Sequence, residues 1–229
     1  MTKKISEELQ ALPLFSSLDQ DQITRVFDRH LEISHETGQV IVMEQDWGES
    51  LFLVSSGLAK VRTFTMDGEE IVMSLLGEGD LFGEMAALDG SSRSADVVAL
   101  TPLNLVKLRV KFFTELLEQH AGFALDLARF DAARLKDLNR RFVLQSGDAT
   151  SRMLDSLAYL AQKSSGTANN PQALIPLLTM RELALVAGLA RETASRTLSK
   201  LRTRGTVIEE DGRLRLVDLQ PLQKRGLLL

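Results

Sequence analysis

Two charged residues lie within a stretch that otherwise consists of small and apolar side chains. In FGEMAALDGSSRSADVVAL, Glu84 follows a glycine, and Arg93 follows a short loop of glycine and serine. A guanidinium, the hydroxyl of Ser94 and the backbone N–H groups of such a loop together suit a phosphate group. The carboxylate of Glu84 suits a sugar hydroxyl. The stretch therefore predicts a cradle for a ligand with one phosphate and one sugar. The predicted contacts are Gly83, Glu84, Met85, Arg93, Ser94 and Ala95.

The same stretch also has a structural interpretation that needs no ligand. A buried arginine or glutamate that lacks a partner destabilises the fold by several kcal/mol. Glu84 and Arg93 would avoid this cost if they formed an ion pair with each other. The spacing of the residues favours neither interpretation over the other.

A second set of polar residues lies near the C-terminus, in LTMRELALVAGLARETASRTLSKLRTR. Thr179 and Glu182 have the S/T-x-x-E spacing of a capping box, which predicts the start of a helix. Gly188 supplies a turn before a second helix, roughly residues 190–203. This spacing is typical of a helix-turn-helix motif. The segment TVIEEDGRLRLVD beyond it predicts the hairpin of a winged helix.

The second of these helices has an apolar face and a polar face. Arg191 and Arg196 are able to bind guanine through two hydrogen bonds each, and Glu192 is able to accept one from cytosine. An amphipathic helix with a solvated charged face would have the same pattern. The capping box, the turn glycine and the hairpin together favour DNA binding. The predicted DNA contacts are Thr179, Arg191, Glu192, Ser195, Arg196, Ser199, Lys200 and Arg202.

The elements that would position these two sites differ in their sequence patterns. Between residues 38 and 110, short β-rich runs alternate with glycines, and Asp67-Gly68 is a strong hairpin signal. Such spacing predicts a closed sandwich or roll. Residues 111–145 contain no proline, and their apolar residues recur at a helical period. Gly122 is a candidate point of division between a short helix and a long one. This long helix must bury its apolar stripe within its own domain or against a second copy of the chain.

Composition excludes several classes of function. The 229 residues include no cysteine, which rules out disulfides, thiolate-bound iron–sulfur clusters and cysteine nucleophiles. His30, His35 and His120 have no metal-ligand spacing, so we expect neither a metal nor a haem. We also expect no membrane span and no signal peptide. The net charge is −4, yet residues 148–229 hold 12 Lys and Arg against 8 Asp and Glu, a weak indication of a polyanion partner.

With these motifs in order, the chain resembles the bacterial cyclic-AMP receptor protein/fumarate–nitrate regulator (CRP/FNR) superfamily of transcription factors, and within it the cyclic-AMP receptor protein branch. The resemblance covers nearly the whole length, from LPLFSSLD through GEGDLFGEMAALDGSSRSADVVAL to LARETASRTLSKLRTRG. Its most specific matches are the phosphate cassette around Arg93 and the RETxxR spacing of Arg191, Glu192 and Arg196.

The resemblance implies an α+β fold in three parts. These are a jelly-roll-like β-roll effector domain over residues 1–112, a dimerisation helix over 113–146 and a winged helix-turn-helix domain over 147–229. It further implies that Glu84 contacts a ribose hydroxyl and that Arg93 contacts a cyclic phosphate. In a dimer, two recognition helices would enter major grooves about 34 Å apart, at a palindromic TGTGA-type site.

Two positions depart from the family pattern. Leu138 and Asn139 stand where the receptor protein has a threonine and a serine that hold the adenine, and only Asn139 is able to hydrogen-bond with a base. Ala190 stands where a serine or threonine often caps the recognition helix. The phosphate of the effector is therefore better defined than its base.

The sequence as a whole predicts a cytoplasmic, homodimeric transcription regulator and not an enzyme. It would bind double-stranded DNA under allosteric control by a cyclic nucleotide, with cAMP the expected effector and RNA polymerase a further expected partner. The alternative is the same DNA-binding regulator responding to another small molecule or to none. A cupin-type enzyme would need a cluster of His and Glu metal ligands on the strands. A regulatory subunit that controls a partner protein would not need residues 178–216.

Overall fold

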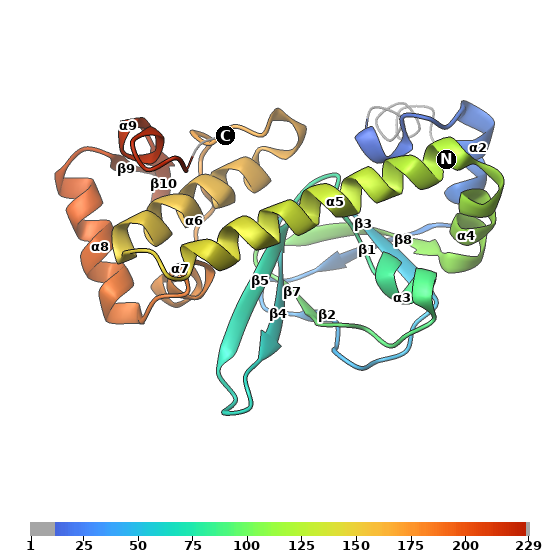
Figure 1. The fold of residues 1–229 in the computed structure, drawn as a ribbon, viewed down its shortest axis with the longest axis horizontal. Helices are drawn as coiled ribbons and strands as arrows, with labels where there is room; N and C mark the ends of the chain where they lie inside the picture. The colour runs from blue at the N-terminus through green and yellow to red at the C-terminus, as the bar shows by residue number, and fades with distance from the viewer. Residues whose placement is uncertain (1–11, 228–229) are drawn as a thin grey trace.

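The structure of the protein is a computed structural model that describes residues 12–227. Residues 1–11 and 228–229, at the ends of the predicted first and last domains, lie outside the described residues. Figure 1 shows a β-roll on one side, a long helix that runs across it, and a mainly helical C-terminal unit at the far end of that helix.

Two four-stranded antiparallel sheets form the roll, with strand orders β1-β8-β3-β6 and β2-β7-β4-β5. The predicted β-rich runs are confirmed as six of these strands, whereas β1, with its mostly exposed LEISH, and the two-residue β6 had no predicted run. The strands are β1 (Leu31–His35), β2 (Val40–Val42), β3 (Ser50–Ser56), β4 (Ala59–Phe64), β5 (Glu70–Leu76), β6 (Leu81–Phe82), β7 (Asp96–Ala99) and β8 (Leu103–Arg109).

Alternate strand residues fill the interior of the roll. Val54, Leu103 and Leu105 are buried there, and the rings of Phe52 and Phe82 stack with their centres 5.0 Å apart. This alternation follows from the two-residue side-chain period of a strand. The connection between β6, at the edge of one sheet, and β7, inside the other sheet, contains the phosphate-cassette residues.

The predicted dimerisation helix over residues 113–146 is divided in the structure. The helix α4 (Val110–Gln119) ends before His120, whose backbone is extended at φ −128° and ψ 95°, and α5 (Ala121–Leu144) begins after it. Phe113 and Phe123 pack against η1 (Pro13–Phe15) and α2 (Gln20–Val26) in a buried cluster. The first turns of α5 are therefore anchored on the roll.

The C-terminal unit confirms the predicted winged helix-turn-helix. Gly188 ends the first helix of the motif at φ +59°, and Asp211 and Gly212 form the hairpin turn with φ values of +49° and +75°. The helix that follows Gly188 begins at Arg191, one residue later than predicted. The elements are α6 (Ala149–Ser164), η2 (Gly166–Ala168), α7 (Met180–Ala187), α8 (Arg191–Thr203), β9 (Val207–Glu210), β10 (Arg213–Leu216) and α9 (Gln220–Gln223).

The roll and the C-terminal unit share one hydrophobic cluster. Leu58, Leu75 and Leu100 of the roll belong to the same buried cluster as Leu157 and Tyr159 of α6. The Tyr159 hydroxyl accepts a hydrogen bond from the Leu75 N–H at 3.2 Å and donates one to the Leu75 carbonyl at 3.3 Å. The two parts are thus packed together by contacts that are distant in the sequence. Among residues 12–227, no helix has both the length and the apolar composition needed to cross a bilayer.

Candidate effector and DNA-binding sites

Arg93 is buried between the end of α3 (Glu84–Asp89) and the start of β7, with 6% of its surface exposed. Its guanidinium donates to three backbone carbonyls: Gly83 at 2.9 Å, Ser50 at 2.6 Å and Gly48 at 3.3 Å. Burial lowers the pKa of Arg93 from its ordinary value, and the charge of Glu84 partly opposes this. The carbonyls fix the orientation of the guanidinium without neutralising it.

Both the backbone conformation at position 83 and the atoms around it require a glycine there. Its φ is +88°, in the left-handed region that favours glycine. A Cβ at this position would lie 2.5 Å from Arg93 Nη1 and 3.0 Å from the Ser50 carbonyl oxygen. The glycine therefore allows the chain to approach Arg93 closely enough to accept its hydrogen bond.

Replacing Gly83 by alanine is expected to destabilise the protein by the left-handed cost of about 1–2 kcal/mol, plus the cost of displacing Arg93. Gly90→Ala is the matched control, because Gly90 has φ +69° but a Cβ at this position would have no neighbouring atom within 4 Å. Urea unfolding of both variants measures the difference. Equal losses in the two variants would show that Arg93 is not held by this contact.

Glu84 pairs with a residue that sequence analysis missed. It is 2% exposed, and Arg134 of α5 donates to its Oε1 at 2.7 Å. Arg134 also donates to the Leu81 carbonyl at 2.6 Å, and its guanidinium lies 4.8 Å from the centre of the Phe130 ring. Burial raises the pKa of Glu84, against the lowering effect of the Arg134 charge. The ion pair between Glu84 and Arg93, one of the two sequence interpretations, is not among the ion pairs of residues 12–227.

A sequence signal for Arg134 does exist. Phe130, Arg134 and Leu138 follow one another at four-residue spacing, which places them on one face of α5. Leu138 is half-buried on this face, whereas Asn139 is exposed on the neighbouring face with Leu135 and Phe142. The structure thus separates the two residues that the sequence analysis grouped as base contacts.

Arg93 has no ion-pair partner of its own among the charged groups around the predicted phosphate cradle that the structure describes. Glu84 and Arg134 neutralise each other, and within residues 12–227 no carboxylate lies at ion-pair distance from Arg93. Ser94 is exposed beside Met85, with its Oγ 4.0 Å from the Met85 Sδ. A buried guanidinium that has no carboxylate at ion-pair distance, with a hydroxyl nearby, is suited to an anionic ligand.

The polar face of α8 is open to solvent. Its opposite face is anchored by Ala194, Leu198 and Leu201, which are buried in the C-terminal core. Ala190 precedes the helix without a side-chain capping bond, as its residue type predicts. Arg202 is ion-paired to Glu209 of the wing at 2.6 Å. All eight predicted DNA contacts are exposed: Thr179, Arg191, Glu192, Ser195, Arg196, Ser199, Lys200 and Arg202.

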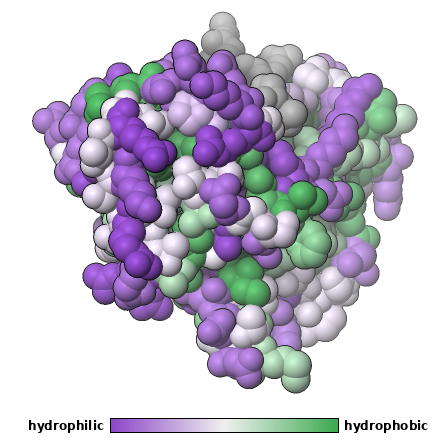
Figure 2. Space-filling view, turned by 60° about the vertical axis from the view of Figure 1, so that its left-hand side comes forward, coloured by the Kyte–Doolittle hydropathy of each residue, from purple (hydrophilic) through white to green (hydrophobic). Residues whose placement is uncertain are grey.

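Figure 2 shows the molecule with its C-terminal side turned forward, where hydrophilic side chains cover most of the surface and hydrophobic ones form separate smaller patches. A surface of this kind suits a polar, charged partner better than an apolar one. The exposed polar side chains of α8 belong to the C-terminal unit, whose surface is mostly hydrophilic in this view.

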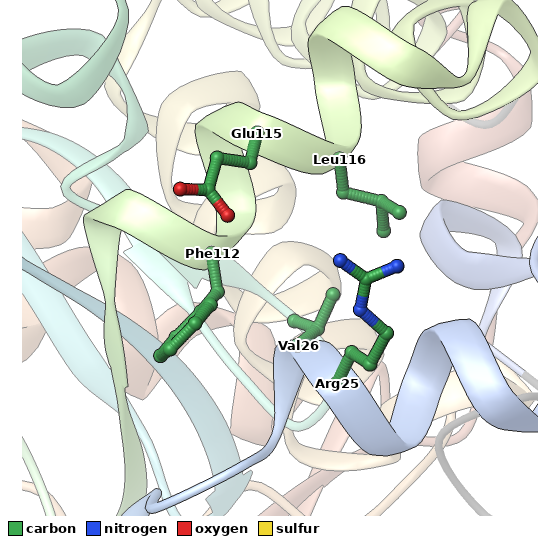
Figure 3. Close-up of a pocket in the computed structure, with 5 residues that line it drawn as sticks. All are labelled: Arg25, Val26, Phe112, Glu115 and Leu116. Carbon is green, nitrogen blue, oxygen red and sulfur yellow. The ribbon is translucent and has the colours of Figure 1, made fainter.

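Two hollows elsewhere do not involve the predicted site residues. Figure 3 shows Arg25 and Val26 of α2 pointing toward Phe112, Glu115 and Leu116 of α4 around a space of about 10 Å³, which is no larger than one water needs. A wider hollow of about 290 Å³ lies between the roll and the C-terminal unit. Within residues 12–227, no group of three His, Asp or Glu side chains could hold a metal ion.

The fold and the two sites define a class of protein in which a β-roll with a buried cationic cradle is joined to a winged helix-turn-helix. The family model for the cyclic nucleotide-binding domain matches residues 32–120, and the model for the Crp-like helix-turn-helix domain matches residues 151–225. The cyclic AMP receptor protein of Thermus thermophilus is 32% identical over 202 residues, which cover 87% of this chain and 89% of that protein.

Solved structures show the same fold. FixK2 of Bradyrhizobium japonicum has a TM-score of 0.74 at 20% identity, over 85% of this chain and 96% of that one. The c-di-GMP responsive regulator CLP of Xanthomonas campestris has a TM-score of 0.69 at 23% identity, over 87% of this chain and all (100%) of that one. The chain therefore belongs to the CRP/FNR family of transcription regulators. This family consists of transcription regulators and not of enzymes.

Proposed function

We propose that this regulator is a cytoplasmic homodimer that binds a palindromic TGTGA-type site and is controlled allosterically by cAMP. Its division into an effector domain over residues 1–112, a dimerisation segment over 113–146 and a DNA-binding domain over 147–229 is part of the proposal. RNA polymerase is the expected partner on DNA.

The buried guanidinium of Arg93, which has no carboxylate at ion-pair distance among residues 12–227, is the observation that carries the effector assignment. A cyclic phosphodiester has one negative charge, which would neutralise this guanidinium. In the proposal, Arg93 and Ser94 hold the phosphate with the Gly83 backbone, while Glu84 accepts a hydrogen bond from the ribose hydroxyl. Met85, Ala95 and Leu138 would line the ligand, and Asn139 would meet its base from the exposed face of α5.

The proposed DNA contacts follow from the position of each residue on the motif. Arg191, Glu192 and Arg196 lie toward the first half of α8, where the recognition helix of such motifs meets base edges. Thr179, Ser195, Ser199, Lys200 and Arg202 are assigned to the phosphate backbone. Arg202 would have to exchange its ion pair with Glu209 for a phosphate oxygen.

A different effector is the second candidate. Leu138 lies on the same face of α5 as Arg134, and its side chain has no hydrogen-bonding group for an adenine. One structural neighbour is described as responsive to c-di-GMP. A larger nucleotide would use the same phosphate contacts with a different contact to the base.

Binding to a fluorescent duplex with two TGTGA half-sites tests the proposal. We expect wild-type affinity to rise about 5–150-fold on adding saturating cAMP, the range typical of allosteric coupling. Arg191→Ala is expected to weaken binding by about 1–3 kcal/mol and to relax specificity at one base pair of the half-site.

Parallel titrations with cGMP and c-di-GMP identify the effector. A response to one of these and not to cAMP would support the second candidate. A protein that binds the duplex equally well under all conditions would contradict control by a nucleotide, and Arg191→Ala binding with unchanged specificity would contradict the assignment of the recognition helix.

A further inference from the structure

A buried lysine joins the roll to the helix-turn-helix. Lys60 of β4 is 3% exposed, and its Nζ lies 2.6 Å from Glu70 Oε1 of β5 and donates at 2.8 Å to Glu182 Oε2 of α7. Burial tends to raise the pKa of Glu70, but its hydrogen bond to Lys60 and the charges of Lys60 and Arg62 lower it overall. The lysine thus forms an ion-pair contact between the two parts of the molecule.

This contact uses a carboxylate that the local sequence assigns to another role. Thr179 and Glu182 have capping-box spacing, yet only one of the two bonds is formed, from the Glu182 N–H to Thr179 Oγ1 at 3.2 Å. In α2, at the same spacing, Asp19 and Gln22 form both bonds, at 2.8 and 2.9 Å. The Glu182 carboxylate binds Lys60 instead of returning to the Thr179 N–H.

The same network extends to the phosphate cassette. Arg62 lies 3.5 Å from Glu70 Oε1 through Nη1 and 3.1 Å from Asp96 Oδ2 through Nε. Asp96 is the first residue of β7 and follows Ser94 and Ala95 directly. A series of ion pairs therefore connects the end of the predicted cradle to the first turn of α7.

We propose that Glu182 is a two-position switch between the effector domain and the DNA-binding domain. Bound to Lys60, it holds α7 against the roll. Released, it completes the capping box of α7 and frees the helix-turn-helix. This inference deepens the proposed function, because it names the contact through which the effector site would control DNA binding.

The position bound to Lys60 is the one with low DNA affinity. The first helix of a helix-turn-helix crosses the DNA backbone, so the start of α7 must approach phosphates. In this structure the carboxylate of Glu70 lies there, with its Oε2 3.9 Å from Arg181 Nη2. An anionic side chain of the roll thus competes with DNA phosphates for the same helix start.

Glu182→Gln and Lys60→Met test the switch. Glutamine at the third helical position is also a capping-box residue, so Glu182→Gln removes the charge and keeps the cap. Without cAMP, each variant is expected to bind the duplex about tenfold more tightly than wild type. The double variant should match Lys60→Met, because that substitution already removes the contact with Glu182 in addition to the one with Glu70. With saturating cAMP, all should match wild type.

Lys111→Met is the control for the loss of a positive charge, because Lys111 pairs only loosely, at 3.9 Å, with Glu115 on its own helix. Hydrogen exchange of ligand-free protein provides a readout that needs no DNA. Faster exchange is expected in β5 and α7 for both switch variants and not for Lys111→Met.

The outcomes separate this inference from the proposed function. Unchanged exchange and unchanged ligand-free affinity in both variants would overturn the switch. Faster exchange with unchanged affinity would also overturn it, because the contact would then hold the domains together without controlling DNA binding. If the duplex affinity of wild type does not change on adding cAMP, the proposed function is wrong. Hydrogen exchange still decides whether Glu182 and Lys60 hold the two domains together.

Discussion

Arg93→Lys is expected to weaken cAMP binding by at least about 100-fold, or about 2.7 kcal/mol at 25 °C. A lysine keeps the positive charge but loses the planar fork that donates to Gly83, Ser50 and Gly48 at the same time. The ammonium would therefore not be held in one orientation. Isothermal titration calorimetry of nucleotide-free protein measures the effect.

The design of this variant separates charge from geometry. Arg129→Lys is a suitable control, since Arg129 is exposed and forms its ion pair with Asp126 on its own helix. It should leave cAMP affinity unchanged. Urea unfolding monitors whether Arg93→Lys also loosens the carbonyl cluster. A cAMP dissociation constant within threefold of wild type would contradict the phosphate cradle and would leave Arg93 with a structural role in holding the three carbonyls.

Leu135→Glu is expected to dissociate the proposed dimer and to weaken palindrome binding on the order of a thousandfold, because the two half-sites would no longer be bound together. Leu135 is 58% exposed on α5, and Phe142 and Val143, about two turns later, are 74% and 69% exposed. Residues 12–227 of this chain leave most of the surface of these apolar side chains uncovered. Two copies packed along α5 would bury them, and a glutamate there would place like charges together.

Leu31→Glu is the matched control, because Leu31 is 59% exposed but lies on β1, away from α5. Sedimentation velocity measures the mass of each variant, and anisotropy with the two-half-site duplex measures DNA affinity. We expect Leu31→Glu to remain dimeric. A dimeric Leu135→Glu that binds DNA normally would show that α5 is not the dimer interface.

The orientation of the two faces of α5 links these predictions. Arg134 and Leu138 lie on the face of α5 that contacts Glu84, whereas Asn139 shares its face with Leu135 and Phe142. If two α5 helices pair, Asn139 lies at their interface. An effector that contacts Asn139 would then act on the dimer contact as well as on the roll.

Local patterns in the sequence were sufficient for most elements of the fold. The β-rich runs, the Asp67-Gly68 turn, the helix cap at Thr179 and the turn at Gly188 are each specified by a few adjacent residues, and the structure confirms them. The sequence placed the division between a short and a long helix at Gly122, whereas the structure places it at His120, two residues earlier. Nothing in the residue type of His120 requires an extended backbone, and the break allows α4 and α5 to pack on the same core.

The partners of the site residues depended on long-range packing. The sequence identified Glu84, Arg93 and the polar face of α8, because charges in an apolar stretch and on an amphipathic helix can be recognised from residue types and their spacing alone. Arg134 lies 50 residues from Glu84, and the carbonyls that hold Arg93 belong to the backbone, which has no sequence signature.

Glu182 shows most clearly that the sequence does not identify partners brought together by long-range packing. Its spacing from Thr179 predicts a capping box, since both residues lie in one helical turn, yet only the bond from the Glu182 N–H is formed. Only the tertiary structure decided where its carboxylate goes, because Lys60 lies 122 positions away and reaches it only when the roll and the helix-turn-helix are packed together. A buried ammonium is a stronger hydrogen-bond partner for a carboxylate than a backbone N–H. Only the tertiary structure identifies such a partner when it is distant in the sequence.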